Sequence, residues 1–64
     1  MIVEYYPESD MLYIRLREGE SVESEEIAPD IVVDYDAHDR VIGIEIENAS
    51  QHIDIHEIEL RSLP

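Results

Sequence analysis

The segment of residues 31–47 constrains the fold of this chain most strongly. It reads IVVDYDAHDRVIGIEIE, two strand-like arms joined by a short polar turn. Apolar residues occupy every second position on both arms, which is the period of a half-buried β-strand. Residues 36–40 between the arms have side chains that bond their own backbone or tolerate left-handed conformations, so we expect a β-hairpin. Because a slip of one residue would expose its apolar face, its register is strongly specified.

Three further segments show the features of strands. Residues 2–6 have high strand propensity and end at Pro7, and residues 11–17 alternate between apolar and polar side chains. Residues 22–28 are a weaker candidate, whose glutamates suit the edge of a sheet. Together with the two arms of the hairpin, these segments predict an antiparallel meander of about five strands.

The end of the chain fits two kinds of structure. After a turn predicted at residues 48–50, Ile53 and Ile55 alternate as in a strand, whereas Ile55, Ile58 and a capping-type Asp54 fit a short helix. We predict a helix over residues 55–62 that packs on one sheet face. The expected fold class is therefore α+β, a small antiparallel β-meander with a short C-terminal helix, in a single domain over residues 1–64.

The size of the chain predicts self-association. A domain of 64 residues is near the lower limit for one hydrophobic core, and chains of this size usually add a further stabilising link such as a disulfide, a metal ion or self-association. Cysteine is absent, which excludes disulfides, so we expect a homodimer. The sequence contains no apolar run of membrane-spanning length and begins without the features of a signal peptide. A cytoplasmic protein without membrane contact is the expectation.

The charge of the chain bears on its partners. Seventeen acidic residues stand against four basic ones, and the net charge is -13. Direct binding of nucleic acid is disfavoured, because affinity for phosphates comes from Lys and Arg. The charge suits a basic protein partner, although acidity for solubility or for a salty cytoplasm is the simpler explanation.

Three segments carry a resemblance to a known family. They are YYPESDMLYIRL, SEEIAPDIVVDYD and DRVIGIEIENAS. Over about residues 5–50 the chain resembles domain-of-unknown-function family 2283, whose pattern is Y-x-P-x-x-D-x-L-Y-I-x-L, an acidic patch, V-x-D-Y-D and G-I-E-I-x-N-A-S. The matching residues are Tyr5, Pro7, Asp10, Leu12, Tyr13, Ile14, Leu16, Glu25, Glu26, Val32, Asp34, Tyr35, Asp36, Gly43, Ile44, Glu45, Ile46, Asn48, Ala49 and Ser50.

The resemblance implies a small antiparallel β domain with a short terminal helix. It brings no catalytic residue and no cofactor to this chain. Some members are encoded beside small proteins that look like toxins, so the resemblance also opens an antitoxin-like role.

Two groups of residues are candidates for a metal site. Acidic side chains share the outward face of the hairpin, with Asp34 and Glu45 as the first candidates, and could hold Ca²⁺ or Mg²⁺; a solvated acidic face is the alternative. His52 and His56 are spaced for zinc on one side of a helix or strand, but a third firm ligand is missing. Histidines that titrate at the surface are the alternative there.

Gly43 lies within the second arm of the hairpin. A glycine inside a strand often marks a bulge or the close approach of another group, here the ring of Tyr13 or Tyr35. Asn48 and Ser50 can bond backbone groups where the strand ends. We expect a structural role for this motif rather than a binding role.

The mixed sheet face is the candidate interface, because Met11, Tyr13, Val32 and Val41 lie there among charges. No acid-base pair in a cleft is indicated, so an enzyme is not expected. We predict a non-enzymatic protein-interaction module that needs no cofactor and is open to an antitoxin-like role. The alternative is a structural homodimer, or one that binds a divalent metal or another ligand.

Overall fold

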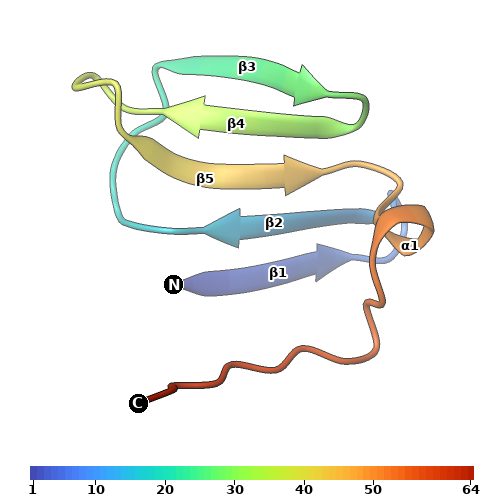
Figure 1. The fold of residues 1–64 in the computed structure, drawn as a ribbon. Coiled ribbons are helices and arrows are strands. Elements are labelled where there is room, and N and C mark those ends of the chain that lie inside the picture. Colours follow the sequence, from blue (N-terminus) through green and yellow to red (C-terminus); the bar gives the residue numbers. More distant parts are fainter.

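A computed structural model describes all residues 1–64 and contains one sheet of five strands (Figure 1). The strands are β1 (Ile2–Tyr6), β2 (Met11–Arg15), β3 (Glu23–Ala28), β4 (Ile31–Tyr35) and β5 (Val41–Ile46), followed by the helix α1 (Ala49–His52). All neighbouring strands are antiparallel. The predicted fold class is confirmed. None of the helices has the length and apolar character needed to cross a membrane.

The strands lie in the order β1-β2-β5-β4-β3. Consecutive hairpins join β3, β4 and β5, and β5 then pairs with β2, so these four strands form a Greek key. The connection from β2 to β3 passes around one end of the sheet (Figure 1). Within it Gly19 lies against Ile42, since a Cβ on this glycine would be 3.6 Å from Cγ2 of Ile42. Ile42 is therefore only 3% exposed.

The pairing register sorts the side chains into two faces, because residues directly opposite one another in antiparallel strands point to the same side. One face carries two adjacent rows of mainly aliphatic residues across four strands. This apolar face consists of Val3, Ile14, Ile44, Val33, Tyr5, Leu12, Ile46 and Ile31. The polar face consists of Ile2, Glu4, Tyr13, Arg15, Ser24, Glu26, Val32, Asp34, Gly43 and Glu45.

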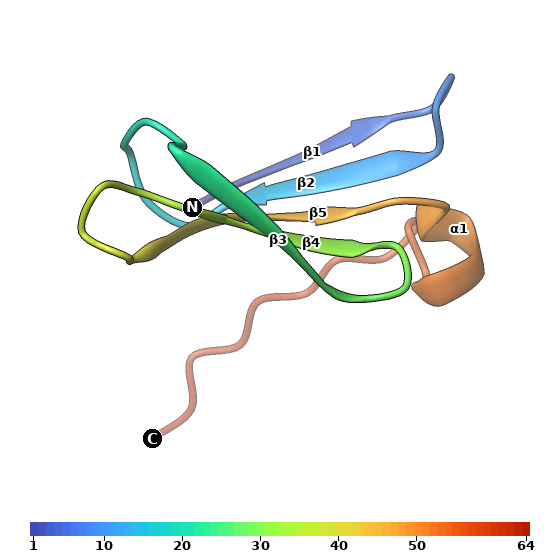
Figure 2. The same cartoon turned by 90° about the horizontal axis from the view of Figure 1, so that it is seen from above.

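Neither face carries a second layer of secondary structure. The one helix has four residues and lies at an end of the sheet, and Figure 2 shows that the chain beyond it leaves the sheet on one side. Six residues in the whole chain are buried, among them Leu12 and Val33 of the apolar face. Domains are usually built from two packed layers around a core. This sheet forms a single layer.

The predicted helix over residues 55–62 is wrong. The helix spans Ala49–His52 instead, where a turn was predicted, and residues 53–64 form neither helix nor strand. Asp54 accepts a hydrogen bond from the backbone N–H of His56 at 3.0 Å, but no helix follows. A helix of this length is marginal unless its apolar side packs on the protein. Ile58 and Leu60 remain 67% and 85% exposed, so this packing does not occur.

Candidate functional site

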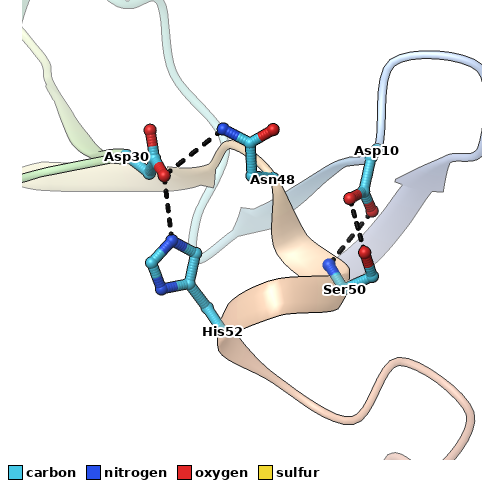
Figure 3. A network of polar contacts seen from close by, with 5 residues as sticks. All are labelled: Asp10, Asp30, Asn48, Ser50 and His52. Carbon is cyan, nitrogen blue, oxygen red and sulfur yellow. Dashed lines mark hydrogen bonds and ion pairs between the residues drawn. The ribbon is translucent and has the colours of Figure 1, made fainter.

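Two hairpin turns hold the start of α1 between them (Figure 3). Asp10 lies in the turn between β1 and β2, and Asp30 lies in the turn between β3 and β4. Both adopt positive φ angles, 53° and 68°, as does Asn48 at 51°. Asp and Asn tolerate this left-handed region better than most residues do. We call the set Asp10, Asp30, Asn48, Ser50 and His52 the α1 clamp.

Asp10 caps the helix from outside. Its carbonyl accepts the N–H of Ala49 at 2.8 Å, and its carboxylate accepts the N–H of Ser50 at 3.0 Å and the Ser50 hydroxyl at 2.6 Å. The Tyr5 hydroxyl donates to the same carboxylate at 2.8 Å. The side-chain bonds from Ser50 and Tyr5 hold the pKa of Asp10 below its ordinary value, and the bond from the Ser50 hydroxyl has the largest effect. The carbonyl and the carboxylate of Asp10 thus each satisfy one N–H group at the helix start that has no partner within the helix.

Asp30 holds the other side of the same segment. Its carbonyl accepts the N–H of Glu47 at 2.8 Å, and its Oδ2 lies 3.0 Å from Nε2 of His52. The side-chain amide of Asn48 donates to Oδ2 at 3.3 Å. The contact with His52, followed by that with Asn48, lowers the pKa of Asp30. The turn between β1 and β2 and the turn between β3 and β4 are thereby both bound to one short helix.

The side chains of the α1 clamp are hydrogen-bonded in pairs that anchor the helix. The Ser50 hydroxyl donates to Asp10, whereas the imidazole of His52 lies against Asp30. Serine, histidine and aspartate therefore stand close together without the sequence of contacts from nucleophile to base to carboxylate that a triad needs. Asn48 and Ser50 have the structural role that was predicted. Their side-chain partners are the two aspartates rather than backbone groups.

A second network crosses the polar face of the sheet. The ring of Tyr13 lies over Gly43, where an added Cβ would be 2.0 Å from the Tyr13 Oη atom. This confirms the predicted close approach at the glycine. The Tyr13 hydroxyl donates to Asp34 at 3.0 Å, and the Ser24 hydroxyl donates to the other oxygen of Asp34 at 2.6 Å. The Arg15 guanidinium stands 5.6 Å from the centre of the tyrosine ring. Side chains from three strands, β2, β4 and β3, are thus connected around one glycine of β5.

The acidic residues that were candidates for a metal site lie in different surroundings. Burial, then the nearby charges of Glu47 and Asp34, raise the pKa of Glu45. Asp36 is 7% exposed and does not join them, because its carboxylate accepts two backbone N–H groups of its own turn and the Arg40 side chain at 2.9 Å. Nowhere in residues 1–64 do three or more histidine or acidic side chains converge in a way that could hold a metal ion.

The two histidines do not share a helix face. His52 lies on α1 and contacts Asp30, whereas His56 lies in the irregular segment beyond it. Their spacing of four residues would align them only if the helix continued. The predicted zinc pair would have to form from a different conformation of this segment.

The predicted interface residues are spread over the polar side of the sheet. Met11, Tyr13 and Val32 are half-buried, and Val41 is 38% exposed next to a bulge in β5. Tyr13 is already engaged with Asp34 and Gly43. The assignment of this face as an interface stays a prediction. Sequence reasoning missed that the opposite, apolar face lacks a covering layer, because the helix expected to cover it does not form.

Strand β3 is the most exposed regular element. All six of its residues are exposed, and it pairs on one side only, with β4. A shallow hollow of about 260 Å³ beside it is lined by Glu23, Glu25, Tyr35 and Asp39. The Tyr35 hydroxyl donates to Glu25 at 3.3 Å. The sequence signal for this region was its block of acidic residues without a basic one.

Most of the α1 clamp lies within residues that a family model matches. A family model described as protein of unknown function (DUF2283) matches residues 2–50 of the chain. The chain belongs to this family. Tyr5, Asp10, Asn48 and Ser50, which help to anchor α1, all lie within the part of the chain that the DUF2283 model matches. Neither the curated proteins nor the solved structures contain a significant match to this DUF2283 chain.

Proposed function

We propose that this protein is a non-enzymatic interaction module that binds a basic protein segment along the free edge of β3. The observation that carries the proposal is this edge strand, which has six exposed residues and one unpaired side. In an antiparallel sheet the free side of an edge strand offers N–H and C=O groups to a further strand. Addition of an extended segment to such an edge is a common mode of peptide recognition.

The charge around β3 selects a basic partner. Residues 18–37 contain no Lys, Arg or His, and their acidic residues are Glu18, Glu20, Glu23, Glu25, Glu26, Asp30, Asp34 and Asp36. Only Asp30 and Asp36 of these have a cationic or imidazole partner within the chain. Like charges facing each other across strands are destabilising, so a second β3 is a poor match for this edge. A segment with Lys or Arg at alternate positions matches it.

The hollow beside β3 adds a place for one such side chain. Three carboxylates and the Tyr35 ring line it. Carboxylates attract a cation, and the face of a tyrosine ring adds a further attraction. An Arg or Lys of the bound segment would enter this hollow while its backbone pairs with β3.

The surroundings of the titratable groups support a role without catalysis. Acid-base catalysis uses two groups in different environments within a cleft. Here the carboxylates with lowered pKa values, Asp10, Asp30 and Asp36, are bound to turn and helix groups. In an antitoxin-like form of the proposal, the partner is a small basic protein that the acidic module neutralises.

A designed peptide with alternating Lys and Val tests the proposal. We expect it to bind the protein and to protect the backbone N–H groups of β3 from hydrogen exchange. The triple variant E23Q/E25Q/E26Q should weaken binding at least about tenfold, which corresponds to about 1.4 kcal/mol.

The control changes the same amount of charge elsewhere. E8Q/E57Q/E59Q also removes three negative charges but leaves β3 intact, and we expect less than about a threefold effect, from long-range attraction alone. Equal weakening by both triple variants, or protection away from β3, would contradict binding at this edge. An antitoxin-like role further requires that a small basic protein co-purifies with the chain from its host.

A further inference from the structure

We infer that a second copy of this chain covers the apolar face, so that two sheets pack face to face as a symmetric β-sandwich. This inference goes beyond the proposed function, which concerns the edge of β3 and a different partner. It rests on the composition of the two faces, on the exposed area and on the missing second layer.

The apolar face is built like one half of a protein core. Across β1, β2, β5 and β4 its rows contain seven aliphatic residues and one tyrosine, Tyr5, with no charged side chain, and Glu25, opposite Val33, borders them on the edge strand β3. Ile14, Ile31, Ile44 and Ile46 are only half-buried, and Val3 is 37% exposed. Burying such side chains is the main favourable contribution to folding and association. The residues after α1 do not provide this burial, since Leu60 and Leu63 are 85% and 79% exposed.

The exposed surface is larger than that of a typical folded monomer of this mass. The chain of 7.5 kDa exposes 5050 Å², whereas a monomeric protein of that mass typically exposes about 4,250 Å². The excess is about 800 Å², the area that each partner contributes to an interface of standard size. Both the exposed residues 53–64 and the open sheet contribute to this area.

A second copy is the occupant that fits the face best. A two-fold axis brings the same apolar rows of both copies together, as a symmetric interface requires, and packed sheets lie about 10 Å apart. The polar face offers no such match, because Glu4, Asp34 and Glu45 would meet their own like charges. The second copy is also present wherever the chain is made. In the resulting sandwich, β3 keeps its free edge, Glu26 stays on the outward face, and Glu23 and Glu25 lie at the rim of the apolar face.

Sedimentation velocity of the unmodified protein tests the inference. We expect twice the mass of 7.5 kDa at micromolar concentration, with dissociation on dilution. Because each copy carries a net charge of -13, raising the salt concentration from low to moderate should strengthen the dimer. A mass of one chain over the whole concentration range would overturn the inference and leave the binding at β3 unaffected.

A matched pair of variants on β1 locates the interface. Val3 belongs to the apolar face and Ile2, its neighbour, to the polar face, and both are exposed. We expect Val3→Asp to raise the dissociation constant at least about tenfold and Ile2→Asp to change it less than about threefold, since only the first buries a charge in the interface. Both substitutions add the same charge.

Other results for the two β1 substitutions would also decide whether the apolar face forms the dimer contact. Equal effects of the two substitutions, or a larger effect of Ile2→Asp, would place the contact elsewhere and overturn the inference. Circular dichroism checks that the variants fold. Should Val3→Asp fail to fold, Val3→Thr keeps the β-branched shape suited to a strand, and it should still weaken the dimer more than Ile2→Thr.

Discussion

Gly43 shows how one missing side chain shapes the polar face. A Cβ at this position would be 2.0 Å from Oη and 2.5 Å from Cζ of Tyr13, so the ring would have to move and its hydrogen bond to Asp34 would be lost. We predict that Gly43→Ala lowers the free energy of unfolding by about 1–3 kcal/mol, as overpacking usually does. In a Tyr13→Ala background the same change should cost much less, which a double-mutant cycle by urea unfolding measures. Equal costs in both backgrounds would contradict the contact.

Asp10 shows how one turn residue sets the position of a helix. It accepts bonds from Ser50 and Tyr5 through its side chain, whereas Glu8 of the same turn is exposed and makes no side-chain bond. We predict that Asp10→Ala lowers the melting temperature clearly, that Ser50→Ala does so less, and that Glu8→Ala has almost no effect. Nuclear magnetic resonance shifts of residues 49–52 should move in the first variant. A melting temperature that Glu8→Ala lowers as much as Asp10→Ala would argue against the clamp.

The strands and the helix differ in how well the sequence predicts them. The strands were predictable because their apolar period of two is local, and the contact at Gly43 followed from a glycine inside such a strand. The helix was misplaced because its anchors come from distant turns. Asp10 lies 40 residues from Ser50, and Asp30 lies 22 residues from His52. No local pattern at residues 48–52 reports these partners, whereas residues 54–62 carry a helical pattern that finds no surface to pack on.

The segment after α1 contributes little to the sheet. Residues 56–64 are all exposed, whereas Ile55 is half-buried. We predict that truncation after Ile55 changes the melting temperature by less than about 3 °C, because a change of 1 kcal/mol shifts it by about 4–8 °C in a domain of this size. Hydrogen exchange should be fast over residues 56–64 and slow over β5, the central strand of the sheet. A large loss of stability on truncation would show that these residues cover the apolar face themselves.

The stability of the whole molecule should pass through a maximum between neutral pH and pH 4. The pKa of Glu45 is raised from 4.5, so its contribution to stability is present at low pH and is lost as the pH rises through the folded value. The pKa values of Asp10, Asp30 and Asp36 are lowered from 3.8, so their contribution is present above 3.8 and is lost as the pH falls through the folded values. Melting curves between pH 3 and pH 8 measure both effects.

Glu45→Gln is the variant that separates the two effects. It removes the carboxylate that burial and neighbouring charges disfavour, so we expect a smaller rise of the melting temperature from pH 7 to pH 5 than in the unmodified protein. The loss below pH 4 should be unchanged. An equal rise of the melting temperature from pH 7 to pH 5 in both proteins would show that the rise comes from the general repulsion of the acidic surface and not from Glu45.

The pairing of two apolar faces is the central claim about the whole molecule. An isotope-filtered nuclear Overhauser experiment on a mixture of labelled and unlabelled chains detects only contacts between copies. We predict intermolecular signals from the methyl groups of Val3, Ile14 and Ile44 and none from Ile2 on the opposite face. Intermolecular signals confined to Ile2, Val32 or the residues after α1, or the absence of any such signal at millimolar concentration, would contradict it.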